Sequence, residues 1–169
     1  MSIMGSANKR ASRRYKDVRV VLNGALAVER EALMQQIGQE PQRMGQKAPE
    51  TALRAWEEEH KADVLTVRVN GASQVEWRQI QRKHPVAKDR RARDLFDGVK
   101  GFSVIPVTIE VLEKFGQVVS GEKVETPTDE EWSEFWENVS PGDMTQLALA
   151  VISVHEETAA QTYGDLVKA

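Results

Sequence analysis

The side chains that could carry out chemistry are few and widely spaced in this chain. Its three histidines, His60, His84 and His155, lie far apart, and none belongs to a metal-binding pattern such as His-Glu-x-x-His. His155 is followed by Glu156 and Glu157, but neighbouring side chains on a helix point about 100° apart and cannot converge on one ion. We therefore interpret these three residues as a solvated helix end, and we expect no metal ion and no other cofactor.

Nucleophilic and phosphate-binding patterns are also missing. The chain has no cysteine, which excludes a thiolate nucleophile and a disulfide framework and fits a reducing cytoplasm. Gly98 and Gly101 lack the Lys-Ser/Thr pair of a phosphate-binding loop, and no serine lies in a Gly-x-Ser-x-Gly elbow. Paired carboxylates such as Glu130-Glu131 are typical of a charged helix face. A triad assembled from distant residues stays open, but we predict a protein that is not an enzyme.

Length and charge limit the class of protein. A chain of 169 residues is one ordinary domain or two small ones, and no run approaches the ~20 apolar residues of a membrane-spanning helix. We expect a soluble protein without membrane contact. Residues 1–16 hold five basic and no acidic side chains, which leaves 18 basic (23 − 5) against 26 acidic residues elsewhere. We interpret residues 1–16 as a disordered basic arm, either a solvated tail or a contact for nucleic acid or an acidic partner.

Two segments with alternating apolar residues predict β-strands. Residues 17–24 place Val18, Val20 and Leu22 on one face, residues 63–71 show the same alternation, and both segments end in Asn-Gly. Because a two-stranded ribbon is marginal alone, we expect the strands to pair and helices or another subunit to cover their apolar face.

Helices are predicted on both sides of these strands. Loops are expected at residues 38–48, which are rich in Gln and broken by Pro and Gly, and at residues 121–126. Apolar spacing predicts a helix over residues 25–39, and Pro49 opens a second one. A third helix is capped by Ser73 and Glu76 and stops before His84-Pro85. A fourth begins near Pro106 and carries Ile109, Leu112, Phe115 and Val119.

The C-terminal part is organised by two successive helix starts. Thr128 and Glu131 have the spacing of a capping box, and Ser140-Pro141 marks a second start with Asp143 in its first turn. The first helix carries an apolar face, and the second is a nearly uncharged run from Met144 to Val154. That face consists of Trp132, Phe135, Trp136 and Val139. An αα-hairpin with these residues in its core is therefore predicted.

Together these patterns predict an α+β fold that is predominantly α-helical. We expect a short two-stranded β-ribbon, about five to six helices and the C-terminal αα-hairpin. The predicted organisation is the arm over residues 1–16, an N-terminal strand-helix-helix-strand part over 17–71, a helical part over 72–160 and a flexible tail over 161–169.

Charge is concentrated in two segments. Residues 78–93 hold seven basic residues against Asp89 alone, whereas residues 122–137 are acidic. The basic segment is either a phosphate-binding face or, as we prefer, the counterpart of the acidic segment within the chain or across a subunit contact. No aromatic interleaving or groove-reading motif accompanies it, so nucleic acid is the less favoured partner. The possible basic contact residues are Arg78, Arg82, Lys83, Arg90, Arg91 and Arg93.

Read as a series, these features resemble the tail assembly chaperones of long-tailed phages that infect actinobacteria, or prophage copies of them. The resemblance covers about residues 17–157. The matching pieces are VRVVLNGALAVEREAL, VLTVRVNGASQVEWRQIQRKHP, FSVIPVTIEVLEKF and EEWSEFWENVSPGDMTQLALAVISVHEE. The chain departs from that pattern at Val86, where the family often has a second proline, at the Arg-rich residues 88–93, and at His155 in place of Asn.

The resemblance implies a non-catalytic helper in the host cytoplasm that is absent from the mature virion. Such a chaperone binds the long helical tape-measure protein and keeps it soluble while the tail tube assembles. Homo-oligomers and a longer, frameshifted form are further partners that the resemblance implies. Candidate partner-binding residues are Trp77, Trp132, Phe135 and Trp136, with the alternative that the tryptophans are plain core. Two other functions stay open: a structural component of a tail or tail-like particle, and a small nucleic-acid-binding regulator.

Overall fold

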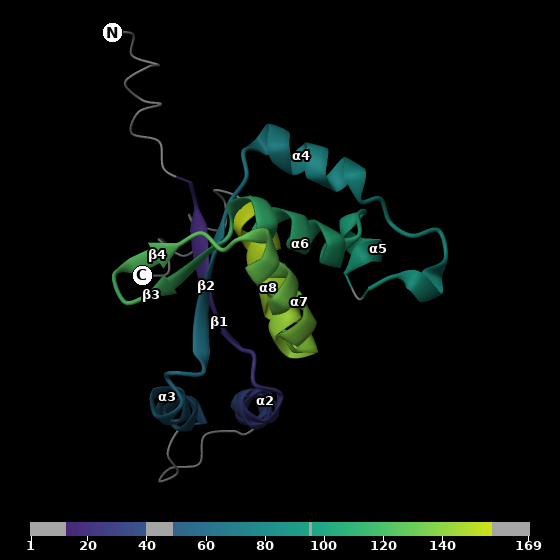
Figure 1. Ribbon diagram of the computed structural model, residues 1–169. Coiled ribbons are helices and arrows are strands. Elements are labelled where there is room, and N and C mark those ends of the chain that lie inside the picture. The colour runs from purple at the N-terminus through teal and green to yellow at the C-terminus, as the bar shows by residue number, and fades with distance from the viewer. Residues whose placement is uncertain (1–12, 40–48, 95, 157–169) are drawn as a thin grey trace, which may run out of the picture. The chain divides into compact units, whose positions relative to one another are not determined.

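The computed structural model describes residues 13–39, 49–94 and 96–156 (Figure 1). The described chain is α+β, as predicted. Its elements in chain order are β1 (Tyr15–Val21), α2 (Gly24–Gln39), α3 (Pro49–Glu59), β2 (Val64–Asn70), α4 (Gln74–Lys83), the 3-10 turn η1 (Arg90–Ala92), α5 (Asp97–Lys100), α6 (Val104–Phe115), β3 (Gln117–Ser120), β4 (Lys123–Glu125), α7 (Asp129–Asn138) and α8 (Pro141–Glu156).

One four-stranded antiparallel sheet replaces the predicted two-stranded ribbon. Its strand order is β1-β2-β3-β4, so the predicted pairing of β1 with β2 is confirmed. β3 and β4 were missed, since residues 121–126 were predicted to be a linker and Val119 to lie on a helix. α6 instead ends at Phe115, where Gly116 takes an extended backbone, and the β-branched Val118 and Val119 then pair with β2. Gly121, with φ +60°, turns the chain from β3 into β4.

Contacts divide the chain into two compact units, each made of separated stretches. Among the described residues, unit 1 comprises 13–16, 69–116 and 148–156, and unit 2 comprises 17–68 and 117–147. Residues 1–12 of the predicted arm and the predicted tail over 161–169 lie outside the described residues, as do residues 40–48 of the predicted loop. Residues 13–16 of the predicted arm are ordered instead of disordered. β1 begins at Tyr15, two residues before the predicted strand, and the carbonyl of Arg14 accepts from the backbone N–H of Gly71 at 2.8 Å.

Unit 2 contains most of the sheet and the paired helices α2 and α3, which lie side by side in Figure 1. The predicted alternation in β1 is wrong at its end, because Val20 and Val21 are both fully buried while Val18 and Leu22 are half-buried. The backbone N–H of Val21 donates to the carboxylate of Asp143 at 3.0 Å. Both faces of the strand end are therefore covered.

The same carboxylate belongs to a buried ionic network in unit 2. Arg30 on α2 donates from Nη1 to Asp143 on α8 at 3.1 Å and from Nη2 to Glu57 on α3 at 3.1 Å. Each of these three side chains is at most 10% exposed, and Arg19 of β1 also bonds to Glu57. Charged groups that leave water must be paired, so this network fixes the mutual positions of β1, α2, α3 and the start of α8.

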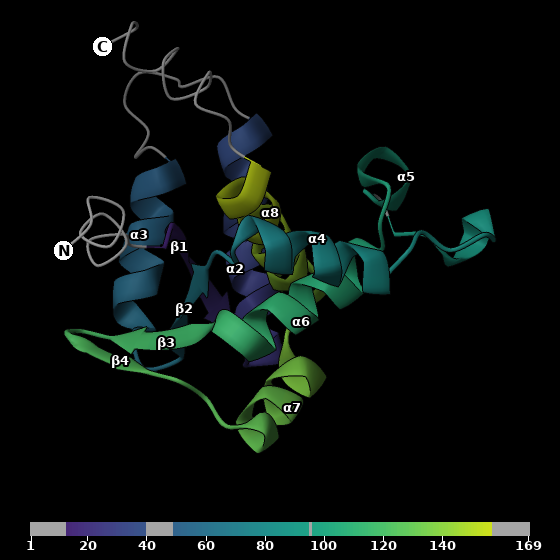
Figure 2. The same ribbon diagram turned by 90° about the horizontal axis from the view of Figure 1, so that it is seen from above.

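Unit 1 is built around the paired helices α4 and α6, which lie alongside each other in Figure 2. The predicted capping box is confirmed, because Ser73 accepts from the backbone N–H of Glu76 while Glu76 accepts from that of Ser73. Trp77 and Ile80 point into the core as predicted, and α4 stops before His84. A buried Asp97 accepts from the backbone N–H groups of Asp94 and Val104, which ties the connection between α4 and α6 in place.

The predicted helices α7 and α8 and the corner between them are confirmed. Thr128 and Glu131 form the second capping box, and Ser140 accepts from the N–H of Asp143 at 3.1 Å to cap α8. The packing of α7 against α8 as a hairpin stays a prediction. None of the described helices is long and apolar enough to cross a membrane.

Candidate functional site

One candidate site is an open groove in unit 2, between α7 and strands of the sheet. Its volume is about 840 Å³. Its walls come from β-strand ends, from the turn that leads into α7, and from one face of α7 itself. The lining residues are Leu22, Leu65, Val118, Glu125, Thr126, Pro127, Glu131, Trp132, Glu134, Phe135 and Asn138. Volumes of about 300–1,000 Å³ are typical of binding clefts, so the groove is large enough to hold several side chains of a partner.

Aromatic side chains of α7 form the floor of this groove. Trp132 is 2% and Phe135 is 5% exposed, and their rings meet edge to face at 5.4 Å between centroids. Trp136 stacks on Trp132 at 5.6 Å and is half-buried, but it does not line the groove. Trp132 and Phe135 are thus mainly core residues that shape the groove from below.

The indole of Trp132 has an unusual feature. Its Nε1 atom is buried and has no hydrogen-bond partner within the described residues. A buried donor without a partner costs about 1–3 kcal/mol. The packing around the indole ring must offset this cost, which underlines the structural role of Trp132.

The rim of the groove is acidic. Glu125, Glu131 and Glu134 line it, and no basic residue does. Glu131 is held in place because its carboxylate accepts from the backbone N–H of Thr128 at 2.7 Å. The carboxylate of Glu134 has no partner within the described residues. An apolar floor with a negative rim favours a partner that presents apolar and basic side chains together.

Trp77, the remaining candidate aromatic residue, lies in unit 1 and is 4% exposed. Its ring stacks on His155 with 4.1 Å between centroids, and Phe102 meets it edge to face at 5.6 Å. The observed burial of Trp77 agrees with the alternative interpretation as a core residue.

His155 is not part of a solvated helix end, as its sequence context predicted. It is 9% exposed, Nδ1 lies 2.6 Å from the carbonyl of Val151, and Nε2 accepts from the backbone N–H of Ala72 at 2.7 Å. Burial lowers the pKa of His155, and the hydrogen bond to Val151 and the charge of Glu156 only partly oppose this. The stacking on Trp77 and the bond to Ala72 come from distant segments, which local spacing could not reveal.

The basic candidates are divided between a helix and the loop that follows it. Lys83 is already paired, because it donates to Glu110 at 2.7 Å, and His84 Nε2 lies 2.6 Å from the other oxygen of that carboxylate. Burial alone would raise the pKa of Glu110, but hydrogen bonds from Lys114, Lys83 and His84 outweigh it and lower the pKa to about 2. Arg93 donates to backbone carbonyls of its own loop. Arg78, Arg82, Arg90 and Arg91 are exposed.

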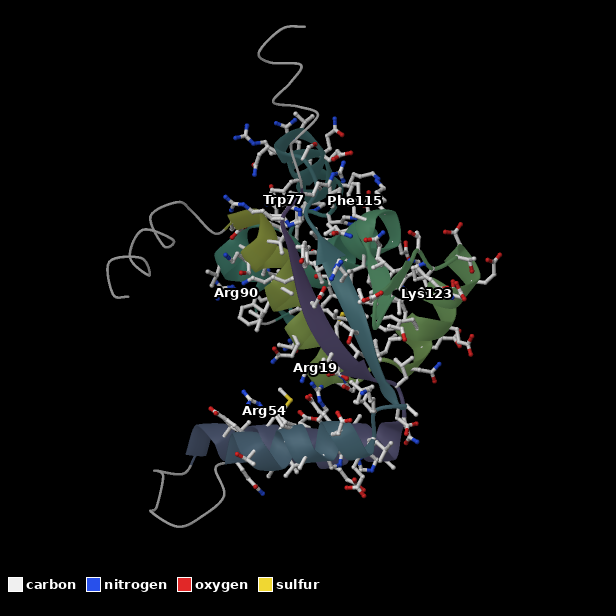
Figure 3. The ribbon with its side chains drawn as sticks, turned by 90° about the vertical axis from the view of Figure 1, so that its left-hand side faces the viewer. Arg19, Arg54, Trp77, Arg90, Phe115 and Lys123 are labelled. Carbon is white, nitrogen blue, oxygen red and sulfur yellow. The ribbon has the colours of Figure 1, made fainter. Side chains whose placement is uncertain are left out.

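A second hollow in unit 2, of about 400 Å³, is polar. Its lining includes Arg54 on α3 and Arg19 on β1, which are labelled in Figure 3. Lys61 and the acidic Glu57 and Glu58 also line it. Arg19 pairs with Glu57, and Lys61 pairs with Glu58 at 3.5 Å. These mixed charges largely satisfy one another, so this hollow is a weaker candidate than the groove.

The groove walls were not predicted from sequence. Leu65 was expected to face a helix, and Val118 was expected to lie within the helix that carries Phe115 and Val119. Gly116 and the Ser120-Gly121 pair flank two β-branched valines, and that signal could have identified the strand. Within the described part of the chain, no group of three or more His, Cys, Asp or Glu side chains could hold a metal ion.

Comparisons with known proteins do not assign the site. No protein-family model matches the chain, and searches of curated proteins and of solved structures return no match.

Proposed function

We propose that this protein is a phage tail assembly chaperone that binds helical segments of a tape-measure protein and keeps it soluble during assembly of the tail tube. The observation that carries the proposal is the open groove along α7, with its apolar floor and acidic rim. The resemblance of residues 17–157 to that family supports it from the sequence. The protein acts by binding, in the host cytoplasm, and not by catalysis.

The groove suits a helix as its occupant. An amphipathic helix lays apolar residues at i, i+3, i+4 and i+7 into a hydrophobic groove, and one helix face can fill a cleft of about 840 Å³. A long tape-measure chain repeats such faces many times. Each chaperone copy therefore covers one short stretch, and many contacts of modest affinity add up along the partner.

The rim defines the preferred segment further. Glu125 at the end of β4 and Glu134 on α7 both line the groove, and Glu125 also pairs with Lys123. Basic residues that flank the apolar stripe of a bound helix would lie next to these carboxylates. We expect affinity to fall with added salt, because these charges are close to solvent.

The test is co-expression with the product of the longest, most helix-rich open reading frame near this gene. The measurements are the solubility of that large protein and whether the two proteins purify together. Glu134→Trp places a bulky side chain in the groove, and Ser133→Trp makes a similar change at the adjacent exposed position, which does not line it. Glu134→Trp should weaken the complex at least about tenfold, whereas Ser133→Trp should leave it intact.

Three results would count against the chaperone. They are equal solubility of the large protein without this chain, equal effects of the two substitutions, and no effect of either substitution on the complex. Circular dichroism of each variant, compared with the wild type, separates a blocked groove from a misfolded protein.

A structural component of a tail or tail-like particle is the second candidate. The observation that favours it is the four-stranded sheet, since such components build on repeated strands and two more strands are present than were predicted. Growth of the purified protein into long regular polymers, without any partner, would support this candidate over the chaperone.

A further inference from the structure

Two oppositely charged segments recur among the exposed residues. The basic segment, residues 78–93, has seven basic residues and Asp89 as its one acid; the acidic segment, residues 122–137, has seven acidic residues and Lys123 as its one base. The first belongs to unit 1 and the second to unit 2. Most of these charged side chains form no ion pair and no hydrogen bond within the described residues.

The loop of the basic segment is held in shape by two of its own charged residues. Arg93 donates from Nε to the carbonyl of Ala87 at 2.7 Å, and Asp89 accepts from the backbone N–H of Arg91 at 3.0 Å to cap η1. These bonds organise the backbone of residues 87–93 from within. The side chains of Lys88, Arg90 and Arg91 are exposed and have no partner within the described residues.

The helix of the basic segment adds two more unpaired cations. Arg78 and Arg82 are one turn apart on α4, so they lie on the same face. Both are exposed and, like the loop residues, unpaired within the described chain, whereas Lys83 is paired with Glu110. Five of the seven basic side chains are therefore available to a partner, on a backbone that is already ordered.

The acidic segment has the complementary composition. Glu125 pairs with Lys123, which Figure 3 labels at the β3–β4 hairpin, and Glu131 completes the capping box of α7. The remaining five carboxylates are exposed and have no partner within the described residues. They belong to Glu122, Asp129, Glu130, Glu134 and Glu137.

We propose that the acidic segment of one copy of this protein docks on the basic segment of a second copy. Five unpaired cations and five unpaired carboxylates, each set on ordered backbone, give electrostatic complementarity between identical chains. A single exposed ion pair contributes little, but several that form together add up and fix the orientation of the two copies. Such a contact joins different surfaces, so it can close into a ring or continue as a chain of copies.

Nucleic acid fits the basic segment less well than a second copy does. Single-strand binding uses exposed aromatic rings beside the cations, but Trp77 on α4 and Phe102, whose ring contacts that of Trp77, are 4% and 3% exposed.

Sedimentation velocity over a concentration series tests the proposal on the full chain. In about 50 mM salt the wild type should be monomeric at about 1 µM and form larger species at about 100 µM. Raising the salt to about 300 mM should weaken this association at least tenfold. Arg90→Glu/Arg91→Glu and, separately, Glu130→Arg/Glu137→Arg should each remain monomeric. The matched control Arg54→Glu/Lys61→Glu changes net charge equally, lies outside both segments and should associate like the wild type.

Mixing the two charge-reversed variants is the decisive experiment. Their reversed segments are complementary to each other, so the mixture should regain association that neither variant shows alone. A wild type that stays monomeric up to about 100 µM would overturn the proposal. So would association that both reversals leave unchanged, or binding of a labelled duplex of about 20 base pairs by a monomeric protein through Arg90 and Arg91.

Discussion

At the scale of single residues, His155 shows how burial can define a protonation state. Its Nδ1 lies 2.6 Å from the carbonyl of Val151 and Nε2 accepts from the N–H of Ala72, so the imidazole is neutral with its proton on Nδ1. A second proton on Nε2 would break the bond to Ala72 and place a charge against the ring of Trp77 in a buried site.

This arrangement predicts acid sensitivity. Burial lowers the folded-state pKa of His155 below its ordinary 6.5, so the unfolded chain binds this proton more readily. The contribution of His155 to stability is therefore present above pH 6.5 and is lost as the pH falls below it. Urea unfolding at a series of pH values should show a declining free energy of unfolding from about pH 7 to pH 5.

Substitution of His155 isolates its contribution. His155→Gln keeps an acceptor for Ala72 but cannot titrate, so its unfolding free energy should decline less over this range. Equal slopes in the wild type and in His155→Gln would show that His155 does not titrate on unfolding. Glu110 contributes equally to both slopes, because the substitution leaves its partners Lys114, Lys83 and His84 in place.

At the scale of elements, local signals were predictable and long-range ones were not. Capping boxes at Ser73 and Thr128 need only the spacing of two residues, and both are present as predicted. β3 was missed because it is four residues long and because Val119 continued the spacing of the preceding helix. The groove combines Leu22, directly after β1, with Leu65 of β2 and Val118 of β3, so it could not be predicted once β3 was missing.

The burial of charged residues could not be predicted from the sequence either. Asp143 was predicted to favour the positive end of a helix dipole, and no prediction was made of its burial. It is 5% exposed because Arg30 and the N–H of Val21, both more than 100 positions away, bind it. Whether a carboxylate is buried depends on such distant donors, which no local pattern encodes.

The Asp143 network predicts a large and coupled loss of stability. Asp143→Ala leaves Arg30 with Glu57 alone and removes the acceptor of Val21, so it should cost about 3–5 kcal/mol. Asp129→Ala, at the exposed first turn of α7, should cost about 1 kcal/mol or less. Urea denaturation measures both changes.

A double-mutant cycle tests whether these groups act together. Arg30→Ala should be similarly destabilising, and the Arg30→Ala/Asp143→Ala protein should lose less than the sum of the single losses, because neither charge is then left buried alone. Additive losses would show that the two side chains act independently.

At the scale of the whole molecule, the chain leaves unit 2 and returns to it at two residues that pair with each other. The chain leaves unit 2 at Arg68 and returns at Gln117, and these two residues are direct partners in the ladder between β2 and β3. Residues 69–116 are thus an excursion inserted between two paired positions of neighbouring antiparallel strands. A two-residue hairpin turn could join the same positions.

A shortened chain tests the independence of unit 2. Residues 17–68, an Asn-Gly turn and residues 117–147 should fold with dispersed amide resonances and cooperative urea unfolding. Most of the sheet, the ionic network and the groove are retained in this chain. A matched chain with Val67→Asp, which places a charge at a fully buried sheet position, should not fold. An unfolded first chain would show that unit 2 depends on the excursion.

The return of the chain at Gln117 also has a consequence during synthesis. A ribosome delivers β1 and β2 early, but the strand that pairs with β2, the helix that carries Trp132 and the carboxylate that neutralises Arg30 emerge only between residues 117 and 147. Until then the apolar side chains of β2 lack the strand that covers them. The growing chain therefore exposes strand edges and apolar surface that can aggregate, and this exposure lasts until residues 117–147 have been synthesised.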